Sequence, residues 1–114
     1  MNYRDGVAIF QQMEKSGNDL DKYWKQLYLS VLECAVDYAQ VRARWLFLTP
    51  VERSEADRRR TIQHDAFISS LNVLARYATK NDYATDWVKV LECDRKEIGD
   101  FACYIACIIG LESR

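Results

Sequence analysis

The fold is decided by the segment Leu20–Leu48, LDKYWKQLYLSVLECAVDYAQVRARWLFL, in a chain of 114 residues. Large apolar side chains recur along this segment in alternating steps of four and three residues, which is the spacing of one face of an α-helix. These positions are Leu20, Trp24, Leu27, Val31, Cys34, Tyr38, Val41, Trp45 and Leu48. Polar residues occupy the opposite face, so we expect one long amphipathic helix, capped at its start by Asn18 or Asp19.

A second long helix is predicted to follow at once. Thr49, Pro50 and Glu52 supply an N-cap hydroxyl, a proline for the first helical position and a glutamate three residues after the cap. The predicted core stripe of this helix consists of Phe67, Leu71, Leu74 and Ala78. Because so short a connection joins antiparallel neighbours, we expect a helical hairpin that ends at Thr79. The charged stretch 52–60 should project beyond the core.

The flanking segments are also predicted to be helical. A first helix is expected over Tyr3–Lys15, and a short helix or turn, capped by Thr85 or Asp86, is expected around Trp87, Val88 and Leu91. Asp94 and Glu97 have the spacing of a capping box, which predicts the start of a final helix. That helix carries a stripe of small residues, which allows another helix to approach closely: Gly99, Cys103, Ala106 and Gly110.

These elements predict an all-α fold. The chain has only four glycines and one proline, the residues that most favour turns, and no apolar run has the period of a strand. We therefore expect a four- or five-helix up-and-down bundle, with residues 1–114 forming a single domain. The long antiparallel hairpin is its scaffold, and the last helix should pack into the groove of that hairpin.

Composition limits the environment and the partners. Sixteen Lys and Arg against seventeen Asp and Glu leave a formal charge of -1, so strong non-specific binding of nucleic acid is not expected. The longest apolar run, Phe101–Leu111, is shorter than the roughly 20 residues that span a bilayer, so no membrane contact is expected. The first residues lack the apolar stretch of a signal peptide. We expect a cytoplasmic protein whose four cysteines are reduced, buried thiols.

One pair of carboxylates stands out on the final helix. Glu97 and Asp100, three residues apart on an otherwise apolar element, point to the same side. The run KEIGDFACYI resembles the E-x-x-D helix of MazG-like all-α nucleoside triphosphate pyrophosphohydrolases over about fifteen residues. The resemblance implies Mg²⁺ ligation by this pair, together with an upstream E-x-x-E, and a nucleotide as substrate. In place of that upstream E-x-x-E, we take Glu33 and Asp37, which lie one turn apart on the long helix, as the nearest pair of carboxylates. Apart from the resemblance, Glu97 and Asp100 also fit a helix start, where the dipole favours acids.

A second candidate is a polar stripe on the helix after Thr49. Its members, which contain few long flexible charges, are Thr61, His64, Asp65, Ser69, Asn72 and Arg76. Such a stripe either faces a partner or ligand, or forms a network satisfied within the protein.

For function, we expect a protein-binding or regulatory module that acts through helix surfaces, with no catalytic residue and no cofactor. Helices this long can extend beyond the core of one small bundle and leave apolar surface exposed, which favours a protein partner or a homodimer. An inhibitor of another protein fits the same observations. The alternative is the Mg²⁺-dependent pyrophosphohydrolase, with Glu97, Asp100, Glu33 and Asp37 as metal ligands.

Overall fold

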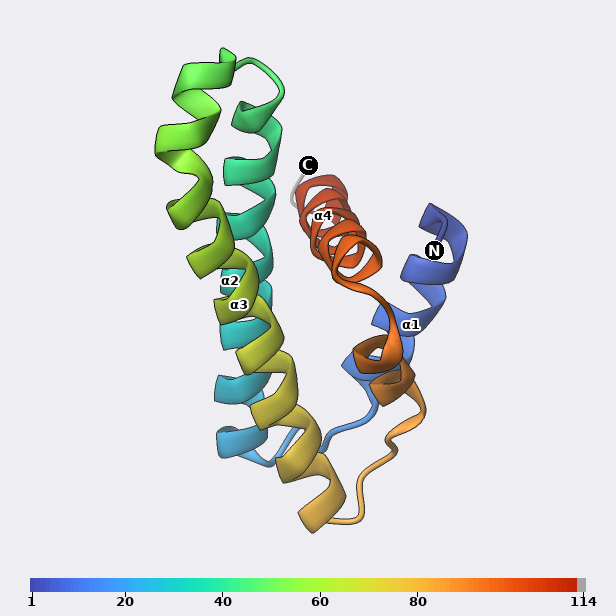
Figure 1. Ribbon diagram of the computed structural model, residues 1–114. Coiled ribbons are helices and arrows are strands. Elements are labelled where there is room, and N and C mark those ends of the chain that lie inside the picture. The colour runs from blue at the N-terminus through green and yellow to red at the C-terminus, as the bar shows by residue number, and fades with distance from the viewer. Residues whose placement is uncertain (113–114) are drawn as a thin grey trace.

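The computed structural model describes residues 1–112, and its regular elements are all helices (Figure 1). They are α1 (Tyr3–Lys15), α2 (Lys22–Trp45), α3 (Pro50–Lys80), the 3-10 helix η1 (Asp86–Glu92) and α4 (Arg95–Glu112). The predicted all-α bundle built on a long helical hairpin is confirmed. The first helix has the predicted bounds.

The connection between α2 and α3 explains why the chain reverses there. The Thr49 hydroxyl accepts a hydrogen bond from the Glu52 backbone N–H at 3.2 Å, and the Glu52 carboxylate accepts one from the Thr49 N–H at 2.9 Å. Arg53 donates from Nε to the carbonyl of Trp45 at 3.1 Å, which satisfies a group at the end of α2. The predicted capping box and hairpin are therefore confirmed.

The start of α2 differs from the prediction. Leu20 lies outside the helix with 88% of its surface exposed, and Asp21 is the N-cap, accepting from the N–H groups of Tyr23 and Trp24 at 3.1 Å each. Asn18 cannot cap the helix because its side chain accepts from the Leu20 N–H at 2.9 Å, within a turn that precedes the helix. The prediction of Asn18 or Asp19 as the cap was wrong.

The core lies where α1, η1 and α4 cover one side of the hairpin. Its largest fully buried side chains come from different elements: Met13, Phe67, Leu71, Leu74, Trp87 and Phe101. The predicted stripe of α3 is buried throughout. This shared interior holds the elements together by burial of apolar surface.

The last helix packs mainly on α2 and α1 and touches α3 much less, so its predicted seat in the groove of the hairpin needs correction. In Figure 1 it lies between the hairpin and α1. Gly99 approaches α2 closely, since a Cβ there would lie 3.0 Å from the Tyr38 hydroxyl, whereas Gly110 faces open space. Only the first part of the small-residue stripe is used for close packing.

Two local predictions also need correction. Thr85 occupies the N-cap position of η1 but makes no side-chain cap hydrogen bond, and Asp86 is already the first residue of that helix. The cysteines are free thiols, but they are not buried: Cys107 is exposed, and Cys34, Cys93 and Cys103 are partly exposed. Across residues 1–112, no helix combines the length and apolar character needed to cross a bilayer.

The hairpin extends well beyond this core. The last buried residue of α2 is Tyr38 and the first of α3 is His64, and no residue between them is buried. We call residues 39–63 the distal hairpin. It rises past α4 as the green turns of Figure 1. The expectation that the stretch 52–60 projects beyond the core is confirmed and extends to both helices.

Candidate functional site

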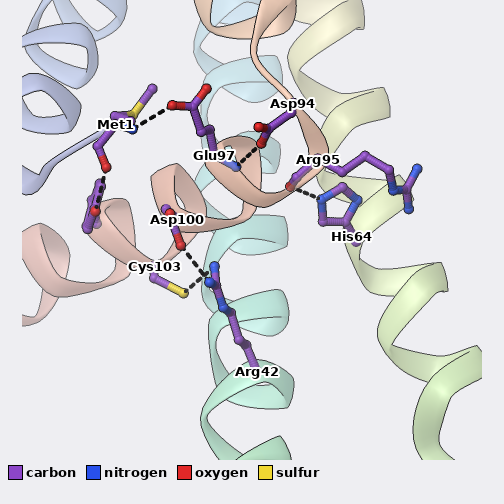
Figure 2. A network of polar contacts seen from close by, with 9 residues as sticks. Met1, Arg42, His64, Asp94, Arg95, Glu97, Asp100 and Cys103 are labelled. Atoms are coloured by element: carbon purple, nitrogen blue, oxygen red, sulfur yellow. Dashed lines mark hydrogen bonds and ion pairs between the residues drawn. The ribbon is translucent and has the colours of Figure 1, made fainter.

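The carboxylate of Glu97 is held by the chain's own amino terminus. Its Oε1 lies 2.7 Å from the Met1 amino group, which has a raised pKa because it donates to this carboxylate (Figure 2). Asp94 caps α4 by accepting from the Glu97 N–H at 2.8 Å. The predicted D-x-x-E cap is therefore only half formed, because the Glu97 side chain turns toward Met1 instead of back to Asp94.

Asp100 pairs with a different cation. Its Oδ1 lies 2.5 Å from Nη2 of Arg42, which rises from α2, and Nη1 of the same guanidinium lies 3.9 Å from Sγ of Cys103 (Figure 2). Burial is the largest single effect and lowers the pKa of Arg42, but the hydrogen bond to Asp100 and the negative charge of its neighbours together outweigh burial, so the pKa of Arg42 is raised. Burial also raises the pKa of the Cys103 thiol. The carboxylate is thus already neutralised from within the chain.

The predicted metal ligands do not assemble into a metal centre. Glu33 and Asp37 are exposed on α2. Within residues 1–112, no three or more His, Cys, Asp and Glu side chains form a group that could hold a metal ion. The similarity to pyrophosphohydrolases therefore lies in the sequence of one helix, and the described residues do not form the metal site that it implies.

An E-x-x-E spacing does occur upstream, at Glu52 and Glu55, and the assignment of Glu33 with Asp37 overlooked it. Both glutamates are exposed on the distal hairpin. Hydrogen bonds from Thr49 lower the pKa of Glu52, whose side chain is used in the capping box. Glu52 therefore caps the start of α3 and does not replace the missing metal ligands.

The predicted polar stripe of α3 divides between two adjoining hollows. Thr61 and His64 line the first, and Asp65, Ser69, Asn72 and Arg76 line the second. Arg95, at the start of α4, lines both. The Asn72 amide donates to the Ile68 carbonyl of its own helix at 3.2 Å, so part of the stripe is satisfied internally. Asp65 likewise accepts a hydrogen bond from the Arg95 guanidinium at 2.9 Å.

The first hollow is lined by four cationic side chains, and we call it the basic pocket. It encloses about 250 Å³ and is lined by Tyr38, Arg42, Arg60, Thr61, His64, Arg95 and Lys96. His64 is 5% exposed, and its Nε2 lies 2.8 Å from the carbonyl oxygen of Arg95 (Figure 2). A carbonyl can only accept, so Nε2 carries the proton of this hydrogen bond. The ring therefore joins α3 to the first turn of α4.

The distal hairpin presents a different kind of surface. Leu46 and Phe47 at its end are 74% and 87% exposed, and Val51, just after the turn, is 69% exposed. Ile62 is a further exposed apolar residue on α3. The ring of Trp45 is covered from α3, since the guanidinium carbon of Arg60 lies 4.2 Å from its centroid. Apolar groups and arginines are thus interleaved where no core supports them.

Comparisons of the chain with protein-family models, with curated proteins and with solved structures gave no match. The geometry described above therefore carries the functional argument.

Sequence reasoning missed the basic pocket because its cations come from three separate helices. One signal was available: Tyr38 and Arg42 on α2, and Arg60 and His64 on α3, are each four residues apart and so share a helix face. That these two faces meet the first turn of α4 depends on packing, which periodicity does not determine.

Proposed function

We propose that the protein is a cytoplasmic binding module that holds an acidic protein partner against the distal hairpin. The observation that supports this most is the absence of any buried residue from 39 to 63, along two helices that elsewhere bury one face. Helices draw most of their stability from packing of such a face. A partner that covers the distal hairpin would bury the helix face that the chain's own core leaves uncovered.

The end of the hairpin has the composition of an anchor. Binding surfaces obtain most of their energy from a few large side chains that enter a pocket of the partner, with polar residues around them. Phe47 and Leu46 are large and almost fully exposed, and neither contributes to the core. Phe47 is therefore the residue that we assign to the centre of the interface.

Charge supports an acidic partner over a second copy of the chain. The distal hairpin contains six arginines (Arg42, Arg44, Arg53, Arg58, Arg59 and Arg60) and three acids (Glu52, Glu55 and Asp57), although the whole chain has a formal charge of -1. Two such hairpins placed side by side would repel, whereas an acidic rim on the partner would attract them and speed association.

The test uses the full chain as bait in an extract of its host, with two matched variants. Phe47→Asp places a charge at the end of the hairpin, and Leu20→Asp places one at an equally exposed leucine before the start of α2. We expect wild type and Leu20→Asp to retain the same protein, and Phe47→Asp to lose it. Arg58→Glu combined with Arg59→Glu should lose it as well, and added salt should weaken retention.

Circular dichroism on each variant checks that the fold is intact. Retention that is unaffected by Phe47→Asp would overturn the proposal. Sedimentation of the pure chain provides the second readout. A dimer that dissociates in Phe47→Asp but persists in Leu20→Asp would identify a second copy as the occupant and contradict the acidic partner.

A further inference from the structure

We propose that the basic pocket at the root of the distal hairpin is a binding site for a phosphomonoester group. Four cationic side chains converge on it from three helices: Arg42 from α2, Arg60 from α3, and Arg95 and Lys96 from α4. Guanidinium groups offer planar pairs of N–H donors to phosphate oxygens, and an ammonium group adds a compact charge. No carboxylate is among the lining residues.

The chain neutralises these cations only in part. Each arginine has one carboxylate partner outside the lining: Asp100 for Arg42 at 2.5 Å, Asp65 for Arg95 at 2.9 Å and Asp57 for Arg60 at 3.3 Å. A guanidinium has five N–H donors, so each one retains donors after such a contact. Lys96 has no carboxylate within ion-pair distance among residues 1–112. The pocket therefore keeps an excess of positive charge.

His64 lines the pocket as a buried side chain. The side chain is almost wholly buried, and its Nδ1 has no hydrogen-bond partner in the described chain. The nearest acid, Asp65, lies 3.6 Å away, which is too far for a hydrogen bond. Nδ1 is enclosed by the protein, as are the unpaired Nε1 atoms of Trp24 and Trp87, so the anion is held by the four cationic side chains and not by this nitrogen.

The direction of α4 adds to the attraction. Arg95 and Lys96 are the first two residues of this 18-residue helix, so the positive end of its dipole lies beside the pocket. A tetrahedral dianion can accept hydrogen bonds on several sides at once, which suits donors that arrive from three helices. A carboxylate offers two oxygens in one plane and would leave part of this set unused.

The test is a titration of the full chain with inorganic phosphate, followed by ¹H–¹⁵N correlation spectra at constant ionic strength with chloride as the reference ion. We expect saturable shifts at Thr61, His64, Arg95 and Lys96. Arg95→Met combined with Lys96→Met should raise the phosphate Kd about tenfold or more, because charged donors are lost. Lys25→Met, which removes an exposed charge near the start of α2, is the control and should leave the Kd unchanged.

Shifts that do not saturate, that chloride reproduces, or that persist with the same Kd in the double variant would overturn the site. A second titration with capped phosphoserine distinguishes the source of the group. Tighter binding than inorganic phosphate indicates a phosphorylated chain, and equal binding indicates a free phosphate or small ester; both support the site. Phe47→Asp should bind phosphate normally, so this test is separate from that of the partner surface.

Discussion

The guanidinium of Arg42 lies 2.5 Å from the carboxylate of Asp100, and this ion pair joins α2 to α4 one helical turn beyond the last buried residue of α2. Below it, Tyr38 and Gly99 pack closely in the core. Above it, both helices of the hairpin continue without buried residues. The pair therefore marks the boundary between the part of the molecule that packs on itself and the part that we assign to binding.

The Arg42–Asp100 pair should contribute measurably to stability. In a double-mutant cycle with Arg42→Met and Asp100→Asn, we expect a coupling energy of about 1 kcal/mol from urea unfolding, since both side chains are only partly exposed and the hydrogen bond is charged. The matched control is the Arg60–Asp57 pair on the surface of α3, for which we expect less than about 0.5 kcal/mol. Equal couplings for the two pairs would contradict the role given to Arg42.

Asp21 should make stability depend on acid pH. The hydroxyl of Tyr83, the Trp24 N–H and the hydroxyl of Tyr77 donate to this carboxylate and lower its pKa. Because the folded chain favours the charged form, the stabilisation is present above the ordinary pKa of about 3.9 and is lost as pH falls through the lowered pKa. In urea unfolding from pH 6 to pH 2, Asp21→Asn should show a shallower loss of stability than wild type. Asp19→Asn, an exposed neighbour, should follow wild type; identical curves for all three proteins would refute the assignment.

Two phenylalanines should respond in opposite ways to truncation. Phe101 is fully buried between α4 and the rest of the core, so Phe101→Ala should cost about 3–5 kcal/mol of unfolding free energy. Phe47 is almost fully exposed, and Phe47→Ala should change that energy by less than about 0.5 kcal/mol. Chemical denaturation of both variants measures the difference. A large loss of stability in Phe47→Ala would mean that the distal hairpin has an intramolecular core.

Gly6 should be sensitive to a single added methyl group. A Cβ at this position of α1 would lie 2.4 Å from Cδ2 of the Tyr104 ring on α4, which is closer than real contacts allow. We expect Gly6→Ala to destabilise the fold by about 1–3 kcal/mol, as overpacking does, despite the better helix propensity of alanine. Gly110→Ala, which meets nothing within 4 Å, is the matched control and should be neutral or slightly stabilising. Similar melting temperatures for both variants would argue against this contact.

The sequence was sufficient for the elements and for most of the core. The apolar spacing around Phe67 and Leu71 and the capping box at Thr49 are local signals, and the structure confirms each of them. The apolar spacing predicted the start of α2 less well. Leu20 continues the spacing, but its N–H bonds to the Asn18 side chain in a turn before the helix, so Leu20 lies outside α2.

The candidate site was harder to predict because its geometry is set by tertiary packing. His64 and Thr61 were identified as part of a polar stripe, but the cations that surround them come from α2 and α4. Arg42 is 54 positions from Lys96, and only the packing of α4 across α2 brings them to one pocket. Glu97 was read as a capping residue or metal ligand, whereas its partner is the Met1 amino group at the other end of the chain.

Hydrogen exchange of the pure full-length chain tests most directly whether the distal hairpin stands outside the core. Amides of residues 24–38 and 64–78 should exchange only through global unfolding, and those of residues 40–45 and 54–62 should exchange at least about tenfold faster through local opening. Equal protection along the whole length of α2 and α3 in the isolated chain would show that the distal hairpin is already covered, and would contradict its assignment as a surface that awaits a partner.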